Sequence, residues 1–259
     1  MFIHASGPAD APAILFLHGN GVNGMMWKAH VQRLAGYHCL APDLPGFGRS
    51  REQAWVSLDA TARQLVEVVC TRAANAKAHV VGLSLGGSTA IKLLSMAPDR
   101  IDHAIVDGAG VLPLPGLPLM KIGFRLMQPF LHREFVIKLI ARGMHIDKAG
   151  YAQFRQDMRA MSPASFRRAF IQALSQRQPP GLEQATCPTL FVSGEKEPEA
   201  VRRSNVMLAR RMPNAQTRMV PGLGHAWGAV DAVDLNIRMV EAWIQDQPLP
   251  RELVDVKLS

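Results

Sequence analysis

Short apolar runs alternate with amphipathic segments along most of this chain. Apolar runs at residues 13–17, 38–41, 78–81, 101–106, 189–192 and 215–220 predict buried strands. Between and after them, apolar positions recur at helical spacing and predict helices over residues 27–34, 58–73, 88–97, 199–211 and 229–245. Strands that alternate with helices in this way are typical of a parallel sheet with helices on both faces. We therefore expect an α/β fold with a doubly wound, mostly parallel sheet.

The stretch of residues 111–183 interrupts this alternation. It begins with three closely spaced prolines, contains only helical patterns and ends at Pro179 and Pro180. We expect it to form a helical cap, or lid, inserted into an α/β core made of residues 1–110 and 184–259. An insertion at this point of such a fold emerges at the edge of the sheet where ligands bind. The cap is therefore expected to be mobile and to cover that edge.

The cap also carries most of the positive charge. The chain of 259 residues has a formal net charge of +8, and residues 111–185 contribute eleven Lys or Arg against four Asp or Glu, which leaves +7 in this segment. Long basic side chains usually point to water, so a solvated outer face explains this charge. A second explanation is attraction of anionic substrates or of an anionic lipid surface. The segment lacks the aromatic pattern of a base-stacking surface, so we expect no nucleic-acid partner.

The remaining global features favour a compact protein of the cytoplasm. Apolar residues make up 48% of the chain, which argues against disorder. The three cysteines, Cys39, Cys70 and Cys187, lack metal-type spacing, and buried thiols in a reducing compartment are the default interpretation. The sequence shows no signal-peptide pattern and no apolar run that approaches the length of a membrane span. We expect a cytoplasmic protein without stable membrane insertion, and its oligomeric state stays open.

Residues 82–86, with the sequence GLSLG, carry the strongest chemical signal. They follow a predicted strand and precede a predicted helix. This is the G-x-S-x-G pattern, which places a serine on a tight turn where its Oγ stands clear of the sheet. The N-terminus of the following helix directs free N–H groups at the serine, so an oxyanion formed there would be stabilised. Ser84 is thus a candidate nucleophile.

A nucleophilic serine needs a base and an acid that orients this base. His225 follows a predicted strand, lies on a Gly-rich loop and comes last in the order Ser, acid, His that such a fold uses. The acid is expected between Ser84 and His225. Glu195 and Glu197 follow the strand at residues 189–194, and Asp107 ends an earlier strand, so all three are candidates.

Together these motifs resemble the α/β-hydrolase family, with its serine esterase, haloperoxidase-like and C–C hydrolase branches. The resemblance covers residues 3–106 and 187–243 and leaves the cap out. The family places its acid, usually Asp, three residues after the glycine that is here Gly194, which implies Glu197, with Glu195 and Asp107 as alternatives. The resemblance also implies an oxyanion hole made by the backbone N–H groups of Asn20 and Leu85.

Two further patterns lie near the same site. Residues 43–50 resemble the family's D-x-P-G-x-G-x-S loop, which we interpret as structural bracing. Residues 19–24 form a literal G-x-G-x-x-G after a strand, and Asp43 lies near the offset of a ribose-binding acid, as in a dehydrogenase. However, the helical pattern begins only near Trp27, after the third glycine. A dehydrogenase would also leave Ser84 and His225 unexplained.

We therefore expect a serine hydrolase that cleaves carboxylic esters of small-molecule acyl substrates. Ser84, His225 and Glu197 would act through an acyl-enzyme, with no cofactor or metal. Two alternatives stay open: a C–C bond hydrolase or perhydrolase that uses the same residues, and a low-turnover ligand receptor that keeps the hydrolase fold. The fold alone does not choose among them.

Overall fold

The sheet is mostly parallel, as the alternation of strands and helices predicts. The computed structural model describes residues 1–114, 116–143, 146 and 148–256. In this part of the chain, seven strands form one sheet in the order β1-β3-β2-β4-β5-β6-β7, and only β1 runs antiparallel to its neighbour. The strands are β1 (Ile3–Ser6), β2 (Ala13–Leu17), β3 (His38–Pro42), β4 (Ala78–Leu83), β5 (Ile101–Asp107), β6 (Thr189–Gly194) and β7 (Ala215–Val220).

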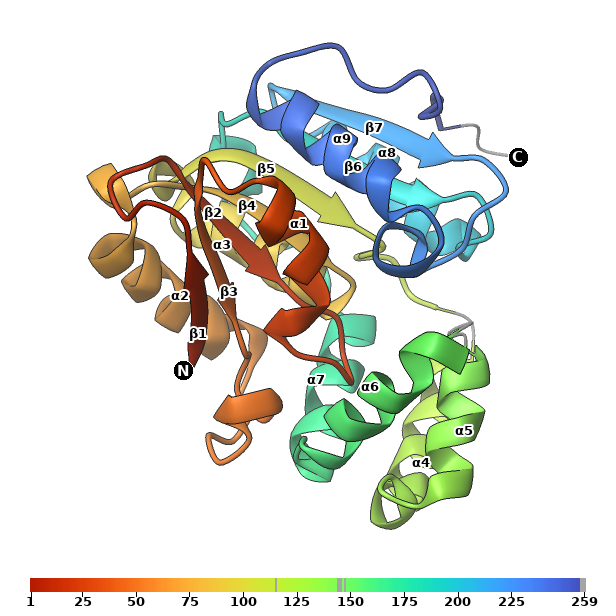
Figure 1. Ribbon diagram of the computed structural model, residues 1–259. Coiled ribbons are helices and arrows are strands. Elements are labelled where there is room, and N and C mark those ends of the chain that lie inside the picture. Colours follow the sequence, from red (N-terminus) through yellow and green to blue (C-terminus); the bar gives the residue numbers. More distant parts are fainter. Residues whose placement is uncertain (115, 144–145, 147, 257–259) are drawn as a thin grey trace.

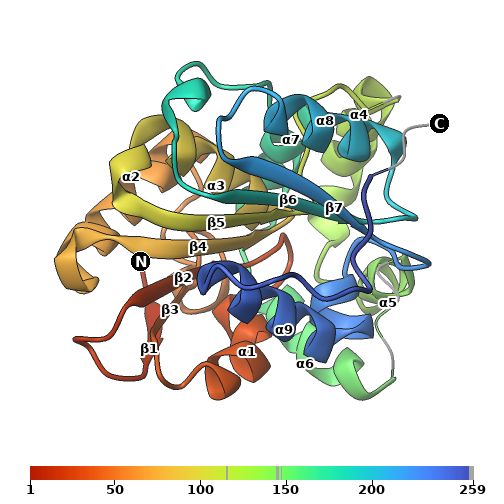
Figure 2. The same cartoon turned by 90° about the horizontal axis from the view of Figure 1, so that it is seen from above.

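Helices cover both faces of this sheet (Figure 2). One face packs against α2 (Leu58–Arg72), α3 (Leu85–Met96) and α8 (Glu199–Ala209), and the other against α1 (Lys28–Arg33) and α9 (Val233–Ile244). Successive side chains of a strand point to opposite faces. In β2, Leu15 and Leu17 accordingly belong to the first core and Ile14 and Phe16 to the second. Because both faces of the sheet are buried, the sequences of its strands are continuous runs of apolar residues.

The structure contains the predicted strands and helices, although some of their ends differ from the predicted residues. It also contains one strand that was not predicted. Helix α3 begins at Leu85, directly after the serine, and not at residue 88. Strand β1 was not predicted, because it is a short edge strand of half-buried or exposed residues and lacks an apolar run. The expectation of buried thiols is wrong for Cys70, which is exposed on α2, whereas Cys39 and Cys187 are buried.

The helical insertion lies between β5 and β6. It consists of α4 (Leu117–Met127), α5 (Glu134–Gly143), α6 (Lys148–Arg159) and α7 (Pro163–Ser175). Figure 1 shows α4, α5 and α6 in green and α7 in teal, as a group beside the sheet, with the loop that follows β2 next to α6 and α7. The carboxyl ends of the strands and the insertion therefore face each other, which is the arrangement expected for a binding site.

Close packing at the junction of β4 and α3 depends on glycine. A Cβ atom on Gly86 would overlap the carbonyl oxygen of Leu17 in β2, and one on Gly82 would overlap the carbonyl oxygen of Gly86. These two positions therefore exclude every side chain. Between them, Ser84 adopts φ 58° and ψ −109°, a backbone conformation that L-residues rarely occupy.

Gly86→Ala is expected to destabilise the protein by about 2 kcal/mol or more, because backbone atoms of β2 must move to admit the methyl group. Gly36→Ala is the matched control, since nothing lies within 4 Å of a Cβ atom there. The free energy of unfolding in urea is the measurement. Equal stabilities for the two variants would contradict this account of the junction.

Candidate functional site

Ser84 lies on a strained turn between β4 and α3. It is the N-cap of α3 and directly follows β4, and its backbone N–H donates to the carbonyl oxygen of Asp107 at the end of β5 over 2.8 Å. This bond holds the strained turn against the neighbouring strand. A strained serine between a buried strand and a helix N-terminus presents its hydroxyl at the surface of the sheet.

His225 and Glu197 form a hydrogen-bonded pair beside this turn. The Nδ1 atom of His225 lies 2.9 Å from Oε1 of Glu197, whose side chain is 1% exposed. Desolvation lowers the pKa of the imidazole, but the charge of Glu197 and its hydrogen bond outweigh this effect and raise the pKa above its usual value. The carboxylate thus fixes Nδ1 as the protonated nitrogen and leaves Nε2 free to accept a proton.

The two alternative acids occupy different surroundings. The carboxylate of Glu195 is exposed and accepts from the backbone N–H of Gly222 over 2.7 Å. Asp107 is buried, and its Oδ1 accepts from Nε1 of Trp227 over 3.1 Å. Among the described residues, Glu197 is therefore the carboxylate that bonds to His225.

The surroundings of Asp107 disfavour the charged form of its carboxyl group. Burial raises the pKa of this carboxyl well above its usual range, and the charge of Glu197 raises it further, against the opposing hydrogen bond from Trp227. Two carboxyl groups that share a small volume do not both ionise easily. Oε1 of Glu197 faces the ring of His225, whereas Oδ1 of Asp107 accepts from the indole N–H of Trp227.

The candidate oxyanion hole faces Ser84. Leu85 is the first residue of α3, where a backbone N–H has no partner within the helix. Asn20 follows Gly19, and a Cβ atom on Gly19 would lie 3.7 Å from Cβ of Ser84. The loop after β2 therefore passes beside the serine, and Asn20 and Ser84 line one cavity.

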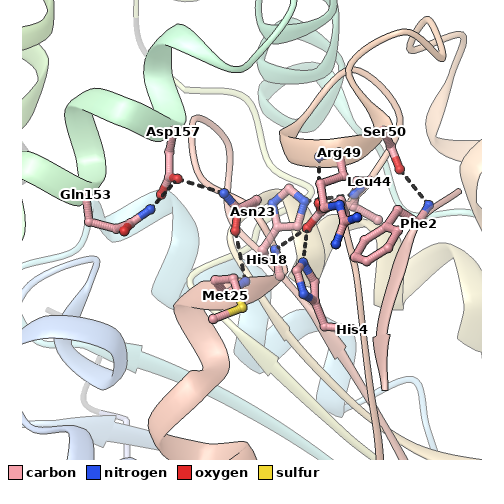
Figure 3. A network of polar contacts seen from close by, with 12 residues as sticks. Phe2, His4, His18, Asn23, Met25, Leu44, Arg49, Ser50, Gln153 and Asp157 are labelled. Atoms are coloured by element: carbon pink, nitrogen blue, oxygen red, sulfur yellow. Dashed lines mark hydrogen bonds and ion pairs between the residues drawn. The ribbon is translucent and has the colours of Figure 1, made fainter. Parts of the chain in front are cut away.

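A buried polar network braces this loop (Figure 3). His18 Nδ1 donates to the carbonyl oxygen of Gly19 over 2.7 Å, and His18 Nε2 accepts from the N–H of Leu44 over 2.9 Å. The bond that Nε2 accepts requires the neutral ring, and burial lowers the pKa of His18 to about 4. The ring therefore acts as a fixed connection between the loops after β2 and β3.

Asp43 also braces the loops after β2 and β3. Its carboxylate accepts from the backbone N–H groups of Gly24 (2.9 Å) and Arg49 (2.7 Å) and contacts Nε2 of His4 (3.0 Å). The third glycine of the G-x-G-x-x-G pattern, Gly24, begins a 3₁₀ turn and lies against β3. The geometry explains this pattern as loop packing.

Two cavities meet at Ser84 and His225. The first has a volume of about 330 Å³ and extends past Asn20 to α6 of the insertion, where Phe154 and Asp157 line it. The second has a volume of about 300 Å³ and extends to α7, where Phe170 and Leu174 line it. No hydrogen bond joins Ser84 to His225 in the described part of the chain; such contacts commonly tighten only when substrate binds.

The insertion is tied to the core next to the first cavity. Asn23 Nδ2 donates to Oδ1 of Asp157 over 2.7 Å, and Gln153 Nε2 donates to the same oxygen over 2.8 Å (Figure 3). Asn23 also caps the following turn, since its Oδ1 accepts from the N–H of Met25. The position of α6 is thus coupled to the loop that carries Asn20.

Several residues of this site carry no signal in the sequence. Gly108 has φ 61°, and a Cβ atom there would lie 2.8 Å from Oε1 of Glu197 and 3.0 Å from Nδ1 of His225. The absence of a side chain at Gly108 therefore leaves room for Glu197 and His225. Trp227 contacts Asp107 and Asp157 contacts Asn23, and both contacts join residues far apart in the sequence. The only hints in the sequence are that Trp227 lies two residues after His225 and that Asp157 lies within the predicted cap. Among the described residues, no three His, Cys, Asp or Glu side chains gather as a metal site requires.

Comparison with known proteins identifies relatives of this chain and a solved structure that shares its fold. A protein from Gibberella zeae named "AB hydrolase superfamily protein" is 28% identical over 252 residues, which cover 92% of this chain and 82% of that protein. A pimeloyl-[acyl-carrier protein] methyl ester esterase from Aeromonas salmonicida is 29% identical over 236 residues, covering 84% and 89%. The structure of a thermophilic esterase from Thermogutta terrifontis has a TM-score of 0.75 at 22% identity and covers 95% of this chain and 93% of that one, which shows a shared fold.

The match to a family model extends over most of the core and the whole insertion. The model, described as the alpha/beta hydrolase family, matches residues 14–235. This range includes the serine turn, both cavities and the His225 loop. The chain belongs to the alpha/beta hydrolase family.

Proposed function

We propose that this protein is a serine hydrolase that cleaves carboxylic esters through an acyl-enzyme. The observation that carries this proposal is the placement of Ser84. It stands on a strained strand-to-helix turn and shares two cavities with His225, whose Nδ1 bonds to the buried carboxylate of Glu197. Nucleophile, base and orienting acid are the three groups that acyl transfer requires.

The chemistry follows from these positions. Nε2 of His225 takes the proton of the Ser84 hydroxyl while the oxygen attacks the ester carbonyl, and the N–H groups of Asn20 and Leu85 stabilise the oxyanion. The C–O bond then breaks, and the alcohol leaves with the proton from His225. A water molecule, deprotonated by His225, attacks the acyl-enzyme and releases the carboxylic acid, which restores Ser84.

The two cavities suit the two halves of an ester. Their walls are mostly apolar, and they meet at the residues that would attack the carbonyl. One cavity can therefore hold the acyl group and the other the alcohol. The esterase names of distant relatives support cleavage of an ester bond.

Ser84→Ala is expected to lower kcat for a short p-nitrophenyl ester by several orders of magnitude, because the attacking oxygen is lost. A fluorophosphonate probe should label Ser84 of the unchanged protein, as mass spectrometry of the digested adduct would show. Ser88→Ala, one turn further along α3, is the control, and the probe should still label Ser84 in this variant. Labelling at another residue, or a fully active Ser84→Ala variant, would refute the role of Ser84. A labelled Ser84 without ester turnover would instead favour the receptor alternative.

Glu197→Gln is expected to lower kcat roughly a thousandfold or more, because the imidazolium loses its counter-charge. His225 must be neutral to accept the proton, so kcat/KM rises as pH increases through its raised pKa. Without the charge of Glu197 this pKa falls, and the acid limb of the profile should move to lower pH. Glu195→Gln is the matched control and should leave both the plateau and the limb nearly unchanged. A large loss of kcat in Glu195→Gln, with little change in Glu197→Gln, would instead identify Glu195 as the acid that orients His225.

Asp107→Asn is expected to change kcat/KM less than about threefold, since burial raises the pKa of this carboxyl well above its usual range and Asn keeps the acceptor for Trp227. Asp107→Ala should instead reduce the free energy of unfolding by about 1–3 kcal/mol, because it leaves the indole N–H without a partner. A loss of activity in Asp107→Asn as large as that in Glu197→Gln would show that Asp107 carries the catalytic charge.

A further inference from the structure

Helix α4 exposes an apolar stripe to solvent. Leu119, Ile122, Leu126 and Phe130 are spaced three, four and four residues apart, and the backbone stays helical through the 3₁₀ turn Gln128–Phe130. They therefore lie along one side of the helix. Leu119 is 74% exposed and Leu126 is 69% exposed. We call these four residues the apolar stripe.

The apolar stripe is not needed to hold α4 on the protein. The helix packs through its other side, where the ring of Phe124 lies 4.4 Å from that of Phe170 and 6.3 Å from that of Phe166 in α7. Helix α5 repeats the arrangement. Its outer side exposes Phe135 and Leu139, whereas Val136 and Ile137 are buried. Large apolar groups gathered on a surface mark an interaction site.

Basic residues accompany these apolar groups on both helices. The cations of this segment are Lys121, Arg125, Arg133, Lys138 and Arg142. Its single acid, Glu134, is bound by Arg155 (2.7 Å) and Arg159 (3.1 Å) of α6. Within the described residues, none of the five cations forms an ion pair. As far as the structure describes the chain, each of the two helices therefore combines positive charge that no ion pair compensates with large exposed apolar side chains.

This combination determines the kind of partner. A bilayer with acidic lipids takes up apolar side chains at the boundary of its acyl chains and binds Lys and Arg through its phosphate groups. A second copy of the chain fits less well, because two such faces would bring their positive charges together. Within the described ranges, no helix is long and apolar enough to cross a membrane, so contact at the surface is the geometry to consider.

We propose that the outer surface of α4 and α5 docks onto an anionic phospholipid surface. The apolar stripe, Phe135 and Leu139 enter the boundary between headgroups and acyl chains, and the cations contact lipid phosphates. This inference does not rest on the proposed function, because binding to lipid requires neither Ser84 nor His225.

The test is flotation of the purified protein with vesicles. One set consists of phosphatidylcholine alone and the other of phosphatidylcholine and phosphatidylserine in equal parts. The unchanged protein should float with the second set and remain in solution with the first. Added salt should reduce the bound fraction, because screening weakens the attraction between the cations and the lipid phosphates.

Paired variants separate the apolar and the charge contributions. Leu119→Ser/Leu126→Ser and Lys121→Glu/Arg125→Glu should each weaken binding by at least about tenfold. The matched controls lie outside the insertion. Val56→Ser/Met96→Ser removes other exposed apolar groups, and Arg63→Glu/Arg72→Glu makes the same change in net charge on α2. Both controls should bind vesicles like the unchanged protein, and all four variants should hydrolyse a short soluble ester at the same rate.

Three results would overturn the proposal. The first is equal binding to both sets of vesicles, or to neither. The second is an equal loss of binding in the control variants, which would show that total charge or hydrophobicity matters and not this surface. The third is a dimer in gel filtration that Leu119→Ser/Leu126→Ser dissociates while vesicle binding is unaffected, which would assign the apolar stripe to a second copy of the chain.

Discussion

The close approach of α3 to β2 and β4 is the constraint on which the rest of the structure depends. It requires that residues 82 and 86 carry no side chain, and it forces Ser84 into a conformation that costs on the order of 1–3 kcal/mol. The surrounding sheet holds this strain through the bond from Ser84 N–H to Asp107. Because β4 lies at the centre of the sheet, loops from the strands on both sides reach the serine.

Two buried carboxyl groups of the candidate site have different partners. Glu197 bonds to the ring of His225, whereas Asp107 accepts from an indole N–H, and burial raises the pKa of Asp107 well above its usual range. Gly108 leaves room for Glu197 and His225, because a Cβ atom there would lie 2.8 Å from the one and 3.0 Å from the other. The electrostatics of the candidate site therefore depend on the partner that each carboxyl group faces, His225 or Trp227. The types of the side chains alone do not determine these partners.

The fold was largely predictable because its signals are local. Buried parallel strands appear as apolar runs and their helices as amphipathic ones, so the sheet and the helical insertion follow from the pattern, and only the polar edge strand β1 escapes it. The turn around Ser84 is equally local. The contact between Trp227 and Asp107 joins residues 120 positions apart, and the bond from Asn23 to Asp157 joins residues 134 apart. Such pairs depend on the complete fold, and no short pattern encodes them.

The two cavities meet at Ser84 and His225 but have different far walls. Helix α6 contributes Phe154 and Asp157 to one cavity, and α7 contributes Phe170 and Leu174 to the other. A change on one helix therefore reshapes one cavity and leaves its neighbour intact. The inserted segment is in this sense modular. Evolution or engineering can adjust recognition of each half of a ligand separately, while the strained turn and the sheet that supports it remain untouched.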